Sequence, residues 1–296
     1  MAGYSDLGAR YLARLYGAGL TYSEMVSAKG LIYANKETCT LLEKTEIETP
    51  FAAQLFTSSP ECMDKAVRLL PEGIDIVDIN MGCPAPKIVK NGEGSALLKD
   101  PVLAGEIVAA AVDASDRPVT VKMRLGFEMG DFVADSVAKA AEKAGASAVT
   151  VHGRYREQMY AGSVDLGKIR AVRDAVNITL FANGDVRSFA DYERALEATK
   201  ADGVMIGRGA LGHYELFAEI AGITVDRTPY EDISLQVEYL KKLYPERVVV
   251  NLMKHHVCAY AAGIAGVAKE IREKVHKAAS FRELQDVVEE YFGGER

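Results

Sequence analysis

The sequence has no long apolar run and no export signal. Across its 296 residues there is no uninterrupted apolar stretch of the length, about 18 residues, that a helix needs to cross a bilayer. The N-terminus lacks the basic start and apolar core of a signal peptide. We therefore expect neither membrane insertion nor export, and the predicted location is the cytoplasm.

Cysteine is scarce and irregularly spaced. The residues are Cys39, Cys62, Cys83 and Cys258. These long spacings fit neither a zinc site nor a small disulfide framework, so we predict reduced thiols and no metal site. For Cys39, Cys62 and Cys258 the ordinary interpretation is a small hydrophobic side chain in the core.

Three further features are missing. No Rossmann domain for a nicotinamide cofactor is predicted. There is no internal repeat beyond the βα unit and no low-complexity segment. The net charge of −7 argues against a uniformly basic surface for nucleic acid, although it leaves room for a local basic patch.

What the sequence does contain is an alternation of short β-branched runs with helical patterns. The helical pattern at 188–200 begins with an N-cap serine, and the pattern at 131–145 ends in glycine. Such alternation is typical of βαβ units and a parallel sheet. The predicted strands are 20–28, 50–57, 74–82, 119–126, 148–154, 179–186 and 203–211.

This pattern predicts an α/β fold, a (β/α)8 TIM barrel followed by a small α-helical domain. Eight parallel strands close a barrel of about 250 residues, and the missing eighth strand is expected before residue 1, so that the first strand is truncated. From Thr228 onward helical patterns replace the alternation, at 231–244, 248–263, 267–280 and 280–292. We therefore predict a barrel domain over 1–226 and a helical domain over 227–296.

Polar residues stand at the ends of six consecutive predicted strands. Active sites of such barrels lie at the carboxyl ends of the strands, so these residues predict an active site, although any one of them alone could be a structural hydrogen bond. Glycines at 182–185 and 206–212, on the last two strands, favour a phosphate-bearing ligand. The polar residues are Gln54, Asn80, Cys83, Lys122, Arg124, His152, Arg154, Asn183, Asp185 and Arg208.

Cys83 differs from the other cysteines because it follows a strand end directly. Pro84 favours an extended backbone at Cys83, and Gly82 leaves space beside the thiol for a planar group. A nucleophilic cysteine requires a base, whereas a general acid needs only to stay protonated, as an unperturbed thiol with a pKa of about 8.5 does at neutral pH. We therefore favour a general acid.

Several segments together resemble the tRNA-dihydrouridine synthases, FMN-dependent enzymes that reduce the C5=C6 bond of uridine in tRNA. The most specific is D-x-N-x-G-C-P with the Lys- and Gly-rich stretch after it, at 78–98. The resemblance spans nearly the whole chain. It is supported by V-K-M-R-L-G at 121–126, H-G-R-x-R-x-Q-x-Y-x-G at 152–162, A-N-G-D at 182–185 and I-G-R-G at 206–209.

The resemblance implies a division of roles. Cys83 would protonate C5 while the reduced flavin gives hydride to C6, with NADPH (or NADH) as the source of hydride. The residues implied near the substrate uracil are Asn80, Arg124 and Arg154. Those implied around FMN are Met1, Ala2, Gln54, Lys122, His152, Asn183, Gly184, Asp185, Gly207 and Arg208.

The helical tail is basic in an otherwise acidic chain. Residues 241–282 contain nine Lys and Arg against three Glu. Such segregation suits contact with phosphates, although a charged run is often only a solvated helix face. The segment 254–263 resembles the tail motif of the family, which implies that Lys254, His255, Tyr260 and Arg272 contact tRNA.

Two other functions fit parts of the sequence. An FMN-dependent TIM-barrel oxidoreductase acting on a small molecule would share the barrel but has no need of a basic helical tail. A non-catalytic tRNA-binding protein would have no need of Cys83 and Lys122. We expect a monomer whose macromolecular partner is tRNA.

Overall fold

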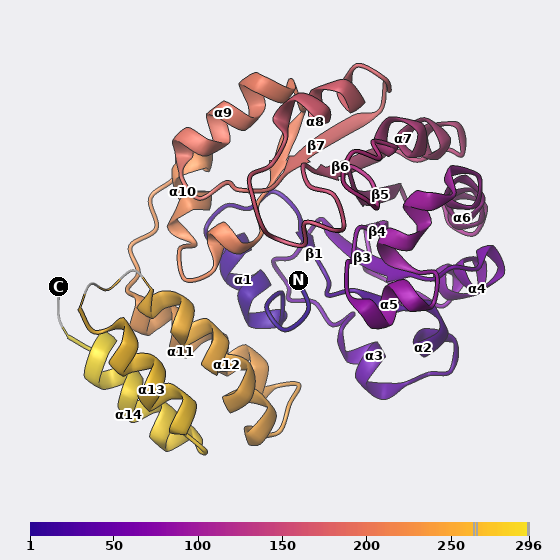
Figure 1. Cartoon of the computed structure of the whole chain (residues 1–296). Coiled ribbons are helices and arrows are strands. Elements are labelled where there is room, and N and C mark those ends of the chain that lie inside the picture. Colours follow the sequence, from indigo (N-terminus) through magenta and orange to yellow (C-terminus); the bar gives the residue numbers. More distant parts are fainter. Residues whose placement is uncertain (263, 265, 295–296) are drawn as a thin grey trace. The chain divides into compact units, whose positions relative to one another are not determined.

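The computed structural model describes residues 1–262, 264 and 266–294, which form two compact units (Figure 1). The barrel unit comprises Met25–Leu42 and Thr49–Gly207. The helical unit comprises Met1–Glu24, Glu43–Glu48 and Arg208–Arg296, so it is built from three separate stretches of chain. The predicted assignment of catalysis to 1–226 and of tRNA binding to 227–296 stays a prediction.

The barrel unit is a parallel, TIM-barrel-like sheet in which successive strands are neighbours. The central strands are buried almost throughout, as expected for parallel strands covered on both faces. The predicted fold class is therefore confirmed. The strands are β2 (Val26–Ser27), β3 (Phe51–Phe56), β4 (Ile76–Met81), β5 (Val119–Arg124), β6 (Ala148–His152), β7 (Thr179–Asn183) and β8 (Gly203–Met205).

Helices of the barrel unit lie along the outside of the sheet, and successive ones pack side by side (Figure 1). Their apolar faces, with Ile107, Val108 and Val137 fully buried, form the main core with the strands. The helices are α2 (Ala28–Ile32), α3 (Lys36–Thr40), α4 (Pro60–Arg68), α5 (Pro86–Lys90), α6 (Pro101–Asp113), α7 (Ala134–Lys143), α8 (Leu166–Arg173) and α9 (Phe189–Thr199), with the 3₁₀ helix η1 (Gly94–Lys99).

Two predicted strands were too long. The run 20–28 forms two short strands, β1 (Thr21–Tyr22) in the helical unit and β2 in the barrel unit. The second ends at Ser27, because the Ser27 side chain caps α2 by accepting from the Gly30 amide. The run 203–211 ends as a strand at Met205, and a 3₁₀ turn, η2 (Arg208–Ala210), follows.

The predicted helix at 131–145 also begins late, at Ala134. The amides of Val133 and Ala134 donate to the carbonyl oxygen of Leu125, which holds this stretch to the preceding loop. The predicted N-cap of α9 is confirmed, since the Ser188 side chain accepts from the Asp191 amide.

The helical unit has its own core. Helices α11 to α14 pack against one another, and α1 lies against α11. Leu12, Met253 and Ile271, from three helices, are completely buried in this core. The helices are α1 (Leu7–Leu15), α10 (Glu215–Ala221), α11 (Pro229–Lys241), α12 (Glu246–Ala261), α13 (Ala268–Lys277) and α14 (Phe281–Phe292).

Gly8 lies where α1 approaches α11 closely, and it gives a stability prediction. A Cβ atom there would lie 2.6 Å from Gln236 Cγ and 2.7 Å from the Gln236 carbonyl oxygen, so backbone would have to move. We expect Gly8→Ala to lower the free energy of unfolding by about 1–3 kcal/mol. Far-UV circular dichroism in a urea titration measures this change.

Gly19 provides the matched control, since nothing lies within 4 Å of a Cβ placed on it. We expect Gly19→Ala to change the free energy of unfolding by less than about 0.5 kcal/mol. Because alanine is ordinarily the better helix former by up to about 1 kcal/mol, a stabilising Gly8→Ala variant would contradict the contact described here.

Candidate active site

The strand register brings the predicted site residues together. Asn80 on β4 stands beside Lys122 on β5, and Arg124 on β5 stands beside His152 on β6. Asn183 on β7 is the next partner of His152. These positions are at the carboxyl ends of their strands, where barrel enzymes place their chemistry.

Cys83 is held at its backbone by Asn80. The Asn80 Oδ1 atom accepts from the amide of Cys83 at 2.9 Å and from the amide of Gly82 at 3.1 Å. The carbonyl oxygen of Cys83 in turn accepts from the hydroxyl of Ser95 at 2.8 Å. The backbone of this half-buried cysteine is therefore fixed on both sides of the thiol.

The glycine that this loop requires is Gly94 rather than Gly82. A Cβ on Gly82 would meet only ordinary contacts, at 3.5 Å or more. On Gly94, which has a φ of +61°, a Cβ would come within 2.9 Å of the Cys83 carbonyl oxygen and 3.1 Å of its Cβ. The sequence analysis gave Gly94 no role, although it lies in the segment 78–98 that carried the resemblance.

Lys122 is half-buried and cationic beside the cysteine. Burial, together with the charge of the neighbouring Arg124, lowers its pKa to about 8 against the opposing effects of Asp78 and Cys83. A lysine in this state is still mostly protonated at neutral pH. It supplies a poorly solvated positive charge at the strand ends, where such a charge interacts strongly with an anionic ligand.

Arg124 and Arg154 are almost completely buried, and both donate to carbonyl oxygens of the loop after β6. Arg124 reaches Met159 at 2.8 Å and also donates to Gly82 at 2.9 Å. Arg154 reaches Ala161 at 3.1 Å and Gly162 at 2.5 Å. These contacts brace the loop 155–162, and the predicted contact of either arginine with substrate stays a prediction.

The predicted phosphate end of the site contains a tight glycine. A Cβ on Gly184, which has a φ of +121°, would lie 2.4 Å from Val164 Cγ1 and 2.9 Å from the His152 ring. The side-chain Nδ2 of Asn183 donates to the Met205 carbonyl oxygen at 2.8 Å. Asp185 pairs with Arg154 at 2.7 Å. The His152 Nε2 atom lies 3.4 Å from Arg154 Nη1, so this end is densely hydrogen-bonded.

The other predicted flavin contacts divide between the units. Gly207 is the last residue of the barrel unit, whereas Met1, Ala2 and Arg208 belong to the helical unit. Their predicted part in flavin binding therefore stays a prediction.

The predicted tRNA contacts lie on α12 and α13. Lys254 donates to the His276 carbonyl oxygen at 3.1 Å, and His255 is exposed, with its ring 5.6 Å from that of Tyr4. Tyr260, in contrast, is in the core, where its ring packs near Phe292. Residue 263, at the end of this predicted motif, lies outside the described residues.

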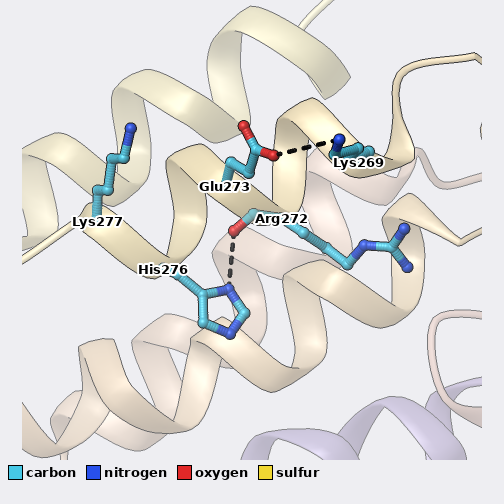
Figure 2. Close-up of a pocket in the computed structure, with 5 residues that line it drawn as sticks. All are labelled: Lys269, Arg272, Glu273, His276 and Lys277. Carbon is cyan, nitrogen blue, oxygen red and sulfur yellow. Dashed lines mark hydrogen bonds and ion pairs between the residues drawn. The ribbon is translucent and has the colours of Figure 1, made fainter.

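Arg272 lines a shallow basic groove on α13. Figure 2 shows its side chain beside those of Glu273 and His276, and the groove has a volume of about 470 Å³. Lys269 pairs with Glu273 at 4.0 Å, so the one acid in the groove is engaged by a cation on the same helix. Lys277 is the remaining lining residue. The net positive charge of this groove suits an anionic partner.

The family model described as "Dihydrouridine synthase (Dus)" matches residues 1–293. The chain belongs to the dihydrouridine synthase family. The protein of Rickettsia bellii named "Probable tRNA-dihydrouridine synthase" is 36% identical over 305 residues, covering 99% of this chain and 93% of that protein. The "tRNA-dihydrouridine synthase B" of Pseudomonas aeruginosa is 37% identical over 296 residues, covering 97% and 87%.

Solved structures outside the family share its fold. The match with morphinone reductase covers 76% of this chain and 85% of that protein, with a TM-score of 0.52 and 13% sequence identity. An old yellow enzyme homologue from Zymomonas mobilis gives a TM-score of 0.51 at 16% identity, covering 75% and 85%. At this level of identity the likeness concerns the fold alone.

Membership in the dihydrouridine synthase family makes the chain an oxidoreductase by descent. Among the residues that the structure describes, no helix is both long and apolar enough to cross a bilayer. Within the same residues, no group of three or more His, Cys, Asp or Glu side chains could hold a metal ion.

Proposed function

We propose that this protein is an FMN-dependent tRNA-dihydrouridine synthase that reduces the C5=C6 bond of a uridine in tRNA. The observation that carries the proposal is the placement of Cys83. Its backbone is clamped by Asn80 at the carboxyl end of β4, one strand away from the half-buried Lys122. FMN bound at these strand ends would supply hydride to C6, with NADPH as its reductant.

The residues present fit a flavin by their chemistry. Gln54 and Asn183 carry amide donors, and Lys122 carries a cation whose low exposure to water strengthens its attraction for an anionic ring. Gly184 admits no side chain, which lets the backbone of this turn approach a phosphate closely. As a cation and a possible hydrogen-bond donor beside the flavin ring, Lys122 and His152 would favour its reduced, anionic state.

The part of Cys83 is to give a proton to C5 on the opposite side of the pyrimidine from the hydride. A general acid must lie within hydrogen-bond reach of the atom that it protonates, so a fixed backbone is an advantage. Uridine inside stacked RNA exposes neither face, so the nucleotide has to leave the stack to enter the site. Asn80 would then lie close to the uracil.

We assign tRNA binding to the helical unit. The groove that Arg272 lines is the basic surface with which phosphates of the RNA would pair, and His255 is exposed on α12. Phosphate contacts position an RNA without reading its sequence, which is what a helical arm of this kind requires. Residues 1–226 would bind FMN and catalyse, and residues 227–296 would hold tRNA.

The direct test is to purify the protein, record its visible spectrum, and add NADPH with tRNA that lacks dihydrouridine. A flavin spectrum and the appearance of dihydrouridine, measured by mass spectrometry of digested nucleosides, are expected. A yellow protein that oxidises NADPH with a small enone or pyrimidine but leaves tRNA unchanged would instead support the small-molecule oxidoreductase. A protein that cannot be reconstituted with FMN would contradict both.

The pKa of Lys122 predicts how the rate depends on pH. Lysine is cationic below its pKa, so the rate of uridine reduction should fall as pH rises through about 8, where Lys122 loses its proton. Single-turnover rates between about pH 6 and pH 9.5 would show this limb.

Lys122→Arg is the informative variant for this limb, because arginine stays protonated throughout the range. It is expected to be slower at neutral pH, since the guanidinium is larger, and to show an alkaline decline that is shifted to higher pH than in the parent. An alkaline decline that is identical in both proteins would assign the limb to another group.

A further inference from the structure

A continuous chain of side-chain hydrogen bonds runs from β5 to the backbone of Cys83. The hydroxyl of Thr120 donates to Asp78 Oδ1 at 2.5 Å, and Gln54 Nε2 donates to Asp78 Oδ2 at 2.7 Å. Asn80 Nδ2 donates to Gln54 Oε1 at 2.8 Å. Asn80 Oδ1 then accepts from the amide of Cys83, so Asp78 is three hydrogen bonds away from the reactive loop.

The direction of this chain is determined from its ends. Backbone amides can only donate, so the Asn80 atom that faces the amides of Gly82 and Cys83 must be oxygen, and its nitrogen must face Gln54. Gln54 must therefore present oxygen to Asn80 and nitrogen to Asp78. Only an acceptor can complete the chain at position 78.

Burial makes the reverse arrangement unfavourable. Asp78 has no exposed surface, Asn80 is 8% exposed and Gln54 is 9% exposed. If either amide turned over, two N–H groups would face each other in a place that water scarcely reaches, and a buried donor without an acceptor is destabilising. The side-chain amides of Gln54 and Asn80 are therefore each restricted to one orientation, and that orientation requires an acceptor at position 78.

We propose that Asp78 is a positioning residue, which acts through Gln54 and Asn80 to fix the backbone at Cys83 and so to aim the thiol. The catalytic part of this proposal rests on the proposed function. The effect on the thiol itself does not, because it concerns the folded protein without any ligand. Neither Asp78 nor Thr120 was assigned a role by the sequence analysis.

A second possible role of Asp78 is its charge. Burial raises the pKa of Asp78 to about 6, against the opposing effects of Thr120, Gln54 and Lys122, so the carboxyl is mostly ionised at neutral pH. Its negative charge raises the pKa of Lys122. A test must therefore separate the loss of an acceptor from the loss of a charge.

Two substitutions that keep the number and branching of the side-chain heavy atoms achieve this separation. In Asp78→Asn the amide oxygen can still accept from Gln54, while the amide nitrogen donates to Thr120, whose hydroxyl both donates and accepts. The direction of the chain survives and the charge is lost. In Asp78→Leu both the acceptor and the charge are lost, so Gln54 loses its hydrogen bond to position 78.

The readout is the rate at which iodoacetamide alkylates Cys83, in a background in which Cys39, Cys62 and Cys258 are replaced by serine. No flavin or tRNA is added. We expect Asp78→Asn to alkylate within about twofold of the parent, and Asp78→Leu to alkylate roughly tenfold faster because its loop is released. Equal acceleration in both variants would assign the effect to charge, and no acceleration in either would overturn the proposal.

Gln54→Met keeps the test decisive if Asp78→Leu does not fold. This variant cuts the same chain one hydrogen bond closer to Cys83 and leaves the carboxylate in place, so it too should accelerate alkylation roughly tenfold. A parental rate in a folded Gln54→Met protein would contradict the proposal. Thr120→Val, which leaves Gln54 its acceptor, is the control expected to stay within about twofold.

Turnover gives the second, independent readout. Asp78→Leu is expected to lower kcat for uridine reduction about 100-fold, as misplacement of a catalytic group by about 1 Å does, with the Kd for tRNA within about twofold. Asp78→Asn should keep most of kcat. If tRNA proved not to be the substrate while Asp78→Leu still alkylated faster, the proposed function would fail and the positioning role of Asp78 would stand.

Discussion

Cys83→Ala is expected to lower kcat for dihydrouridine formation about 1000-fold while the protein stays folded and binds tRNA normally. General acid catalysis contributes about 10²–10⁴-fold, and alanine removes the only proton that position 83 can give. The backbone contacts that hold the loop are made by the amide and carbonyl of residue 83, so alanine preserves them. Single-turnover reduction of tRNA, read by mass spectrometry, measures the loss.

Cys62→Ala is the matched control, since Cys62 is also a half-buried thiol of the barrel unit but lies in α4. Its kcat should be unchanged. Cys83→Ser should recover little of the lost rate, because a hydroxyl is a far weaker acid than a thiol. A Cys83→Ala protein with kcat within about threefold of the parent would exclude the proposed acid.

Asp6→Asn is expected to cost the helical unit about 3–5 kcal/mol of its free energy of unfolding. Asp6 lies buried at the N-terminus of α1, where it accepts from the Ala9 amide at 2.9 Å and from His256 Nε2 at 2.7 Å. Asparagine still caps the helix, but it replaces the carboxylate oxygen that faces His256 Nε2 by an N–H group, at a ring that is 1% exposed. Breaking a buried pair in this way is costly.

The comparison is with Asp64→Asn on the barrel unit. Asp64 pairs with Arg68 at 2.8 Å, but their side chains are 38% and 57% exposed, and such pairs contribute about 0–1 kcal/mol. Urea titrations of the two variants should therefore differ by several kcal/mol. Equal losses would show that burial does not strengthen the Asp6 interaction.

The same pair predicts how stability depends on pH. Burial by itself would raise the pKa of Asp6, but the charge and hydrogen bond of His256, with the Ala9 amide and Gln236, hold it below the usual value. A carboxyl whose pKa is lowered on folding stabilises the folded state at pH values above its pKa in the unfolded chain, which is about 3.9. This stabilisation is lost as the pH falls through the pKa of the carboxyl in the folded state. The difference between the parent and Asp6→Asn should therefore shrink below about pH 4.

The sequence predicted the parts of the site that follow from strand order. The predicted strands carried Gln54, Asn80, Lys122 and His152 toward their carboxyl ends, and the register shows that Asn80 and Lys122 are neighbours. The chain of hydrogen bonds could not be predicted in this way. It depends on which of two amide orientations Gln54 adopts, and that is settled by contacts between strands rather than along one.

Burial of polar residues was the other feature that the sequence left open. Arg124 and Arg154 are 2% exposed, because their guanidinium groups satisfy carbonyl oxygens of a loop whose path depends on the tertiary structure. The burial of Tyr260 could have been predicted. It lies at helical spacing from Met253 and Val257, which form the buried face of α12.

The discontinuity of the helical unit bears on how the chain folds as it leaves the ribosome. The barrel unit lies entirely within residues 25–207, of which only Glu43–Glu48 belong to the helical unit. Helix α1, in contrast, belongs to a unit whose other helices are all encoded after residue 207. Asp6 and His256 are 250 positions apart. At ordinary rates of translation the time between synthesis of α1 and synthesis of those helices is on the order of 10 s. During this time the apolar face of α1 is not buried in its native core, so we expect chaperones to bind it.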